Sequence, residues 1–362
     1  MSKIISIGTA LPQHRHEQET ILQFMQQLYG MDDIEKRKLR FLYRHSGINT
    51  RYSCIADYSR PMQDWKFYPQ SENIEPFPTL EQRMDWYQKF APPLSVHAIR
   101  KCLDRKISEE EITHFITVSC TGMSAPGLDL QVMELMDLRK DIFRTSVNFM
   151  GCYAALHALK MADMICRSTP DAKVLIVCTE LCTLHLQKEV TQDNLASGLL
   201  FADGSAAVVV TGDEHPTKGI SLKSFYSEVV TKGKKDMSWE LSSTGFQMTL
   251  SGYVPDLIEE DIEALVDKAL SKQSLTAKDI SQWCIHPGGK KILEAVQKSL
   301  GIGKDELKNS YHVLEQYGNM SSASILFVLK EMMHNLMQHE GQKIFGVAFG
   351  PGLTMETFIA ES

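Results

Sequence analysis

Apolar residues recur along the chain with two different periods. Short runs rich in Val, Ile and Phe predict β-strands at Lys3–Ile7, His114–Ser119, Lys173–Cys178, Ala206–Thr211, Gly219–Phe225, Gln282–His286, Lys343–Ala348 and Met355–Ile359. Longer stretches with apolar residues three or four positions apart predict helices at Gln18–Tyr29, Ile34–Phe41, Ala154–Arg167, Leu257–Ser271, Lys290–Leu300, Lys304–Asn309 and Ser322–His339. This alternation of strands and helices is typical of an α/β fold.

The order of these segments indicates two halves of similar layout. Each half has a strand, a chemically reactive residue where a strand meets a helix, a long helix and closing strands. The turn-rich segment Gly212–Lys218 is the natural joint, so we expect an N-terminal half over residues 1–213 and a C-terminal half over residues 214–362. Ile55–Thr79 is rich in Pro, Asp, Ser and aromatic residues without a regular period, which predicts an irregular surface segment.

Composition and charge narrow the functional classes. A chain of 362 residues is long enough for two domains, and its formal net charge of −7 gives no overall electrostatic reason to bind nucleic acid or an anionic membrane. No apolar run approaches the roughly 20 residues that a bilayer span requires. The segment that follows Met1 is too short and too strand-like for a secretory signal. We therefore expect a cytoplasmic protein with no membrane span and no nucleic-acid partner.

The eight cysteines raise the question of whether one is reactive. None forms a C-x-x-C pair and the histidines lack the spacing of zinc ligands, so we expect free thiols and no metal site. Cys152 follows the run Val147–Gly151 and precedes a predicted helix with small residues in its first turn. The unpaired N–H groups and the macrodipole of a helix N-terminus favour a thiolate and lower its pKa. A buried packing cysteine is the alternative.

Two polar residues occupy comparable junctions in the C-terminal half. His286 ends an apolar strand and precedes Pro287–Gly289, whose glycines let a bulky ligand approach the backbone closely. A histidine in this place can point into a crevice between layers or be structural. Asn319 opens a predicted helix, where it can cap the helix or present its amide to a developing oxyanion.

Four segments together resemble those of the chalcone and stilbene synthase family, the type III polyketide synthases. They are Gly-Cys-Tyr-Ala-Ala at 151–155, Ile-His-Pro-Gly-Gly at 285–289, Tyr-Gly-Asn-Met-Ser-Ser at 317–322 and Phe-Gly-Pro-Gly-Leu at 349–353. The resemblance extends over nearly the whole chain, and Val118–Gly127 is more similar to the bacterial members than to the plant ones. It implies a thiolase fold, with a duplicated five-layered αβαβα architecture, and a homodimer.

The resemblance also implies a catalytic triad of Cys152, His286 and Asn319. Cys152, as a thiolate paired with His286 as imidazolium, takes the acyl group of an acyl-CoA starter. His286 and Asn319 stabilise the enolate that forms when malonyl-CoA loses CO2, and this carbanion attacks the acyl group on Cys152. Repeated rounds lead to pyrone or resorcinol-type polyketides. Acyl-CoA and malonyl-CoA are substrates, and no cofactor is implied.

The family pattern places further residues around the cavity. Phe201 matches the gatekeeper phenylalanine, whose ring favours loss of the malonyl carboxylate, although an isolated Phe could equally be core packing. Met248 stands where plant enzymes have a second gatekeeper phenylalanine. Other cavity positions fall on Cys120, Thr121, Cys182, His185 and Ser321, with Ala125 expected to reach the cavity of the partner subunit. Because Cys120, Cys182 and His185 replace plant threonines, the plant starter and product are not implied.

Binding of CoA requires basic residues near the cavity entrance. The candidates are Arg44, His45, Arg51, Gly288, Gly289, Lys290 and Lys291, of which the basic ones could equally be solvated surface charges.

Two other functions are compatible with the same residues. A ketoacyl-ACP synthase III-like enzyme also uses Cys, His and Asn, but its histidine is typically followed by Gln-Ala-Asn, and Pro287–Gly289 favours CoA substrates instead. A catalytically silent thiolase-fold partner subunit would usually lack a triad residue, and this chain has all three.

Overall fold

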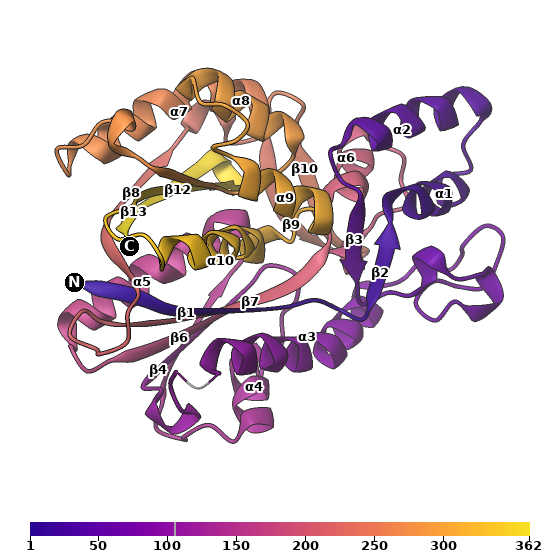
Figure 1. Ribbon diagram of the computed structural model, residues 1–362. Helices are drawn as coiled ribbons and strands as arrows, with labels where there is room; N and C mark the ends of the chain where they lie inside the picture. Colours follow the sequence, from indigo (N-terminus) through magenta and orange to yellow (C-terminus); the bar gives the residue numbers. More distant parts are fainter. Residues whose placement is uncertain (105) are drawn as a thin grey trace.

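The main sheet consists of two groups of strands with the same pairing pattern (Figure 1). In the computed structural model, which describes residues 1–104 and 106–362, the N-terminal group is β1 (Ser2–Ala10), β7 (Asp203–Gly212), β6 (Lys173–Leu181), β4 (His114–Ser119) and β5 (Phe143–Asn148). The C-terminal group is β8 (Ile220–Val229), β13 (Thr354–Glu361), β12 (Lys343–Gly350) and β11 (Gln282–Ile285). In each group the first two pairings are antiparallel and the remaining ones parallel. The two halves therefore share a topology.

The two groups of strands meet at β1 and β8. These strands pair over three residues, from Ser2 opposite Leu222 to Ile4 opposite Ile220, and connect the sheet across both halves. The chain passes from one group to the other after β7 ends at Gly212, within the segment predicted to be the joint.

The helices form three layers around the strands. The central layer is α5 (Ala154–Ser168) and α10 (Ser324–Leu336), and the outer layers are α3 (Leu80–Leu103) with α4 (Leu128–Met136) and α7 (Val254–Ser271) with α8 (Lys290–Leu300) and α9 (Lys308–Tyr317). Three apolar clusters fill the spaces between layers, and the middle one contains α5 and α10 together with strands of both halves. Alanines along the buried face of α5 let it pack closely between the sheets. The arrangement confirms the predicted αβαβα order.

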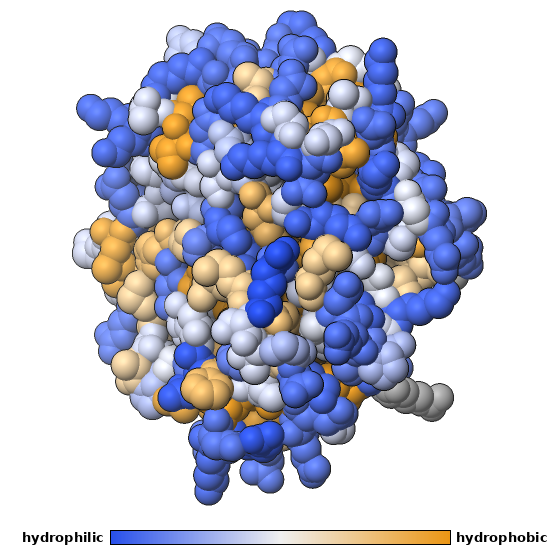
Figure 2. Space-filling model, turned by 90° about the vertical axis from the view of Figure 1, so that its left-hand side faces the viewer, coloured by the Kyte–Doolittle hydropathy of each residue, from blue (hydrophilic) through white to orange (hydrophobic). Residues whose placement is uncertain are grey.

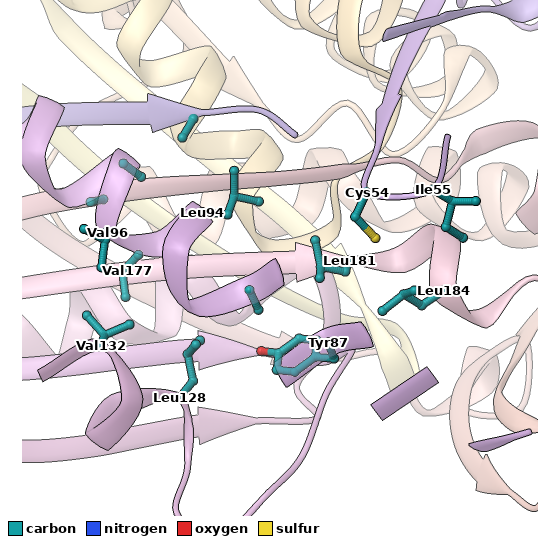
Figure 3. Packing of buried hydrophobic residues seen from close by; sticks show 14 of the residues in the cluster. Cys54, Ile55, Tyr87, Leu94, Val96, Leu128, Val132, Val177, Leu181 and Leu184 are labelled. Carbon is teal, nitrogen blue, oxygen red and sulfur yellow. The ribbon is translucent and has the colours of Figure 1, made fainter. Parts of the chain in front are cut away.

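Helix α3 covers the outer face of the N-terminal strands. Leu94 and Val96 from α3 pack beside Val177 and Leu181 of β6 (Figure 3). At its N-terminal end the Tyr87 hydroxyl donates to Ser119 Oγ at 2.7 Å. The sequence did not predict this helix, because it contains two consecutive prolines, which remove hydrogen-bond donors and usually end a helix.

Smaller elements lie beside one end of the sheet. They are α1 (Gln18–Leu28), α2 (Asp33–His45), α6 (Gln192–Leu200), the pair β2 (His14–Glu17) and β3 (Thr50–Ser53), and the hairpin β9 (Met237–Ser242) and β10 (Gly245–Leu250). Like α3 and α4, helix α6 and both small sheets lack a strong period and were not predicted. The predicted helix at Lys304–Asn309 is wrong: most of that segment is turn, favoured by Gly303 and Asp305, and α9 begins at Lys308.

The segment Ile55–Thr79 is irregular, as predicted, with two single 3-10 turns at Asp57–Ser59 and Met62–Asp64. It does not lie only on the surface, because Trp65 is buried together with the neighbouring aromatic side chains. The Asp57 carboxylate orders it by accepting the backbone N–H groups of residues 66–68 at 2.9–3.1 Å.

One face of the molecule is mostly hydrophilic. The side drawn in Figure 2 is covered mainly by hydrophilic side chains, between which lie separate apolar patches. Among the described residues, no helix is both long and apolar enough to cross a membrane.

Candidate active site

Cys152 lies in the 3-10 turn Gly151–Tyr153, between the end of β5 and the start of α5. Gly151 has a φ of +73°, and a Cβ there would come within 2.1 Å of Pro351 in the Gly-Pro-Gly loop. Only glycine lets the chain pass under that loop, and the close approach places the thiol in front of α5. Cys152 is therefore at a helix start, as predicted.

The second central helix begins at the same point. The turn Ser321–Ala323 leads into α10, and Cys152 Sγ lies 3.7 Å from Ser321 Oγ and 4.0 Å from Asn319 Oδ1. The N-termini of α5 and α10, each with unpaired N–H groups, thus face one site between the two halves.

His286 follows β11 and is 1% exposed. Neither of its ring nitrogens has a hydrogen-bond partner among the described residues. Two other histidines line the same cavity, but the nitrogens of His16 contact Ser59 Oγ and the Ile55 carbonyl, and those of His185 contact the Thr121 carbonyl and the Phe246 N–H. Of the three imidazoles, His286 is the one whose nitrogens are left for a ligand.

Both ends of the Asn319 amide make hydrogen bonds. Its Oδ1 accepts the N–H of Ser321, the first residue of the turn before α10, at 2.9 Å. Its Nδ2 donates to the Gly288 carbonyl at 3.2 Å, in the loop that follows His286. Its backbone makes two hydrogen bonds of 2.9 Å with the Leu200–Ala202 segment, which fixes Asn319 beside Phe201.

Burial sets the protonation of the thiol and the imidazole. Desolvation raises the pKa of Cys152 to about 12, although the hydrogen bonds of the thiol with Ser321 and Asn319 act in the opposite direction. Desolvation also lowers the pKa of His286 to about 3. The predicted lowering of the Cys152 pKa is not found, because desolvation of the thiolate, together with the nearby Glu180 carboxylate, outweighs the hydrogen bonds that favour it. The unliganded site favours a neutral thiol and a neutral imidazole.

One cavity brings most of the predicted residues together. Those that line it are Cys152, His286, Asn319, Phe201, Met248, Cys120, Thr121, Cys182, His185, Ser321, Arg51 and Gly288. The other candidates lie outside its lining. Ala125 is exposed in the loop between β4 and α4, and Arg44 and His45 end α2.

Gly289, Lys290 and Lys291 lie where α8 begins, directly after the cavity-lining Gly288. A Cβ on Gly47, just past the end of α2, would lie 3.4 Å from the Lys290 side chain. The end of α2 and the start of α8 are therefore neighbours at the edge of the cavity.

Arg51 occupies a different place from the surface candidates, since it is 3% exposed. Its Nε donates to Gln18 Oε1 at 2.9 Å and its Nη1 to the Phe201 carbonyl at 2.6 Å. Gly318, whose φ is +69°, packs against the Arg51 stem, where a Cβ would come within 2.9 Å. The buried guanidinium therefore fixes the position of the Phe201 backbone.

Several residues around the cavity carried no signal in the sequence. Ile21 and Met25 on α1 have the spacing of ordinary core residues, and Trp239, which donates to the Cys120 carbonyl at 2.7 Å, lies in the hairpin that was not predicted. Glu180 was also missed, although a carboxylate within the apolar run of β6 was a visible anomaly.

Glu180 is fully buried and connects the two halves. Its Oε2 accepts the Cys120 N–H and the Thr121 hydroxyl at 2.9 Å, and its Oε1 accepts the Ser322 hydroxyl at 2.5 Å. Burial raises the pKa of Glu180 to about 7, since these hydrogen bonds offset only part of the desolvation.

Two family models match the chain. The N-terminal domain of chalcone and stilbene synthases matches residues 1–214, and the C-terminal domain of the same family matches residues 221–362.

Relatives in other organisms match over nearly the whole chain. A putative chalcone synthase of Bacillus subtilis is 28% identical over 99% of this chain and 98% of its own length. Alpha-pyrone synthesis polyketide synthase-like Pks18 of Mycobacterium tuberculosis is 29% identical over 98% and 89%. Probable polyketide synthase 1 of Dictyostelium discoideum is 31% identical over 98% of this chain, which spans 11% of that longer protein.

Solved structures have the same fold. PKS-I of the brown alga Ectocarpus siliculosus superposes with a TM-score of 0.93 at 28% identity, over 100% of this chain and 98% of that one. The C-terminal type III polyketide synthase domain of Steely1, a type I/III hybrid from Dictyostelium, superposes with a TM-score of 0.90 at 29% identity, over 100% and 99%.

The raised pKa of Glu180 predicts a pH-dependent stability. The contribution of Glu180 to the free energy of unfolding is fully present below its ordinary pKa of 4.5. It is lost as the pH rises through about 7, because the folded state binds the proton more tightly than the unfolded state does. Glu180→Gln keeps an acceptor for Cys120 and Thr121 but cannot ionise. We expect the variant to gain roughly 3 kcal/mol relative to the parent between about pH 4 and about pH 8. Urea unfolding across that range measures the difference, and a difference that does not change with pH would contradict it.

Proposed function

The chain belongs to the chalcone and stilbene synthase family and is a type III polyketide synthase, and on this basis we propose that Cys152, His286 and Asn319 condense malonyl-CoA with an acyl-CoA starter. The observation that carries the proposal is the meeting, in one cavity, of a buried thiol, an imidazole with two unpaired nitrogens and a side-chain amide. These are the groups that acyl transfer through a thioester requires.

Loading of the starter follows from the neutral state of the site. Cys152 Sγ attacks the thioester carbon as its proton passes to a free nitrogen of His286, which acts as general base. The bond between the acyl carbon and the CoA sulfur then breaks, and the sulfur leaves as a thiol with the proton that His286 held. The acyl group remains on Cys152 as a thioester.

Loss of CO2 from malonyl-CoA then produces the carbanion for condensation. His286 and Asn319 donate hydrogen bonds to the thioester oxygen, which becomes negative as the enolate forms. Asn319 Nδ2 donates to the Gly288 carbonyl in the free protein, so it turns toward the substrate or shares its protons. The Phe201 ring, beside the cavity, disfavours the malonyl carboxylate and so promotes its loss.

The cavity supports a bacterial-type member that makes pyrone or resorcinol-type products. Cys120, Cys182 and His185 all line the cavity, so it differs in shape and polarity from one lined by the plant threonines. The Bacillus and Mycobacterium relatives support the bacterial type, and the latter is named for alpha-pyrone synthesis.

The presence of all three triad residues around one cavity argues against a silent partner subunit, and the family match over both halves argues against the ketoacyl-ACP synthase III branch. Incubation with malonyl-CoA and a panel of short, aromatic and long-chain acyl-CoAs, followed by mass spectrometry, tests the function. Absence of any extended product from every starter would overturn it.

The triad roles predict different defects in two variants. Cys152→Ala should abolish covalent acyl loading and product formation, because neither of the other cavity thiols, Cys120 and Cys182, lies directly before an α-helix. Asn319→Ala should retain some loading. Its rate of malonyl-CoA decarboxylation should fall by a factor on the order of 10²–10³, which is typical for the loss of one oxyanion donor.

Radiolabelled acyl-CoA measures loading and release of CO2 measures decarboxylation. Cys284→Ala, which removes a buried thiol outside the cavity lining, is the control for general damage. Acyl label on Cys152→Ala, or parental decarboxylation by Asn319→Ala, would contradict the assignment.

Met248 lines the cavity together with Phe201, and we propose that the pair forms the gate. One ring and one flexible thioether restrict a passage less than two rings do, so we expect an enzyme that accepts several starters, including fatty ones.

Met248→Phe should narrow the starter range and affect acetyl-sized substrates least. The ratio kcat/KM across a chain-length series measures this. Gln247→Phe, on the exposed face of the same strand, is the matched control, and parallel curves for parent and Met248→Phe would mean that the position does not gate.

We also propose a two-fold homodimer. Strand β5 has β4 as its only strand neighbour in the described sheet, so its outer edge is unpaired. The exposed side chains of Phe143 (70%) and Met123 (51%) lie on β5 and on the loop that contains Ala125. A second copy would cover both and bring Ala125 near the partner's cavity. Sedimentation should give twice the mass of one chain, and a stable 40.9 kDa monomer at micromolar concentration would exclude the dimer.

A further inference from the structure

The cavity extends from the triad to a region between α1 and α6, which lie beside the same end of the sheet (Figure 1). Asn194 and Gly198 line it from α6 and are four residues apart, so they share one face of that helix. A Cβ on Gly198 would lie 3.2 Å from the Leu186 side chain and 3.6 Å from that of Met25 on α1. This part of the cavity, the α1–α6 arm, is lined by Ile21, Met25, Leu186, Gln187, Asn194 and Gly198.

Two buried amide side chains line the α1–α6 arm, and each is 9% exposed. Gln187 Nε2 donates to the His185 carbonyl at 3.0 Å and to two carbonyls of the β9–β10 hairpin at 3.4 Å. Asn194 Nδ2 donates to the Glu189 carbonyl at 2.8 Å. Because a carbonyl oxygen can only accept, these contacts fix the nitrogen end of each amide toward the backbone.

The oxygen end of each amide is left for the cavity. Among the described residues, no donor contacts Gln187 Oε1 or Asn194 Oδ1. A buried acceptor without a hydrogen bond is unfavourable, so each oxygen is a place for a donor that enters with the substrate. The side chains beside them, those of Ile21, Met25 and Leu186, are apolar.

The chemistry of the α1–α6 arm specifies a neutral donor on an aliphatic chain. Of the described residues that line the cavity, none is Asp or Glu, so an ammonium group would lose its hydration without gaining a counter-charge. A carboxylate would face two acceptor oxygens and gain no hydrogen bond from them. A hydroxyl group supplies the donor, and the carbon chain that carries it packs against the apolar side chains.

The α1–α6 arm leads away from the edge at which CoA is expected to bind. Gly289 approaches the C-terminal end of α6, where a Cβ on it would lie 3.5 Å from the Leu200 side chain. Phe201, which is bonded to Asn319, follows directly. Asn194 lies six residues before Leu200, or about 9 Å along the helix, toward its N-terminal end. The terminal hydroxyl of an extended hydroxyoctanoyl chain lies at a comparable distance from its thioester carbon.

We propose that the α1–α6 arm selects acyl-CoA starters whose aliphatic chain carries a hydroxyl group near its far end. The inference rests on the proposed loading of Cys152 and narrows the class of starter. With the acyl group on Cys152, the chain lies in the arm and its hydroxyl donates a hydrogen bond to Gln187 Oε1 or Asn194 Oδ1. The same chain without the hydroxyl leaves both oxygens unpaired and is therefore the poorer substrate.

Starters that differ by a single hydroxyl group test the proposal. The probes are octanoyl-CoA and its derivatives hydroxylated at carbon six, seven or eight, each with saturating malonyl-CoA. Incorporation of radiolabelled malonyl units into extended product measures kcat/KM for the starter. We expect kcat/KM for the best hydroxylated starter to exceed that for octanoyl-CoA roughly tenfold, as for one hydrogen bond to a buried acceptor.

The double variant Gln187→Met/Asn194→Leu replaces both amides with apolar side chains of similar size. The ratio of kcat/KM between the hydroxylated starter and octanoyl-CoA should fall to about one, because no acceptor remains for the hydroxyl. Octanoyl-CoA makes no such hydrogen bond, so its own kcat/KM measures general damage to the fold. Gln192→Leu, at an exposed position of the same helix, is the matched control and should keep the parental ratio.

Equal kcat/KM of the parent for octanoyl-CoA and all three hydroxylated starters would overturn the proposal. A preference that the double variant retains would overturn it as well, even with lower activity toward every starter. That result is expected if the two oxygens accept the pantetheine N–H groups that all CoA substrates carry. If no starter gives acyl-Cys152 in the parent, the proposed function fails instead.

Discussion

The active site depends on the meeting of two buried helices, α5 and α10, at one point between the halves of the fold. Each begins with a short 3-10 turn, and the two turns bring Cys152 and Ser321 into contact. Glu180 holds this junction, because its carboxyl group accepts hydrogen bonds from the loop after β4 and from the turn before α10. A fully buried carboxyl group with its acceptors occupied fixes geometry at the cost of a raised pKa.

The burial that positions the catalytic groups also decides their resting charge. Burial raises the pKa of the Cys152 thiol and lowers that of the His286 imidazole, which favours the neutral form of both before substrate enters. In the mechanism that we propose, the helix N-termini and the side chain of Asn319 act where negative charge develops, on the attacking sulfur and the thioester oxygen. In such a site the hydrogen-bond donors are in place before the reaction, and the free enzyme does not need to hold a thiolate–imidazolium ion pair.

Phe201, the proposed gate, and Asn319, the proposed oxyanion donor, are joined through their backbones. Two backbone hydrogen bonds tie Asn319 to the Leu200–Ala202 segment, and Arg51 braces the Phe201 carbonyl from the side of α1. A substrate that passes Phe201 therefore contacts a segment bonded directly to Asn319. We therefore expect starter choice and decarboxylation to be coupled through this backbone, whereas Met248 lies on a separate hairpin, where a substitution should change the passage without moving the proposed triad.

The sequence by itself determined the α/β class and the four motifs that carry the family resemblance, and it predicted a division into two similar halves. These are local features: strand and helix periods, and glycines such as Gly151 next to reactive residues. It did not reveal α3, whose prolines Pro92 and Pro93 contradict a helical pattern that burial against β6 nevertheless stabilises. It also gave the wrong direction for the Cys152 pKa, since helix position is a local property but desolvation is not.

Only the tertiary structure decided which residues share the cavity and in which state they are. From the sequence Arg51 could be a surface cation, but in the structure it is buried and donates a hydrogen bond to the Phe201 carbonyl. Glu180 interrupts an apolar strand in the sequence, but in the structure it accepts a hydrogen bond from Ser322 of the other half. The physical reason is the same in each case. The hydrogen-bond partners of Arg51 and Glu180 come from segments 33 to 150 residues away along the chain, and a one-dimensional pattern does not show that such segments meet.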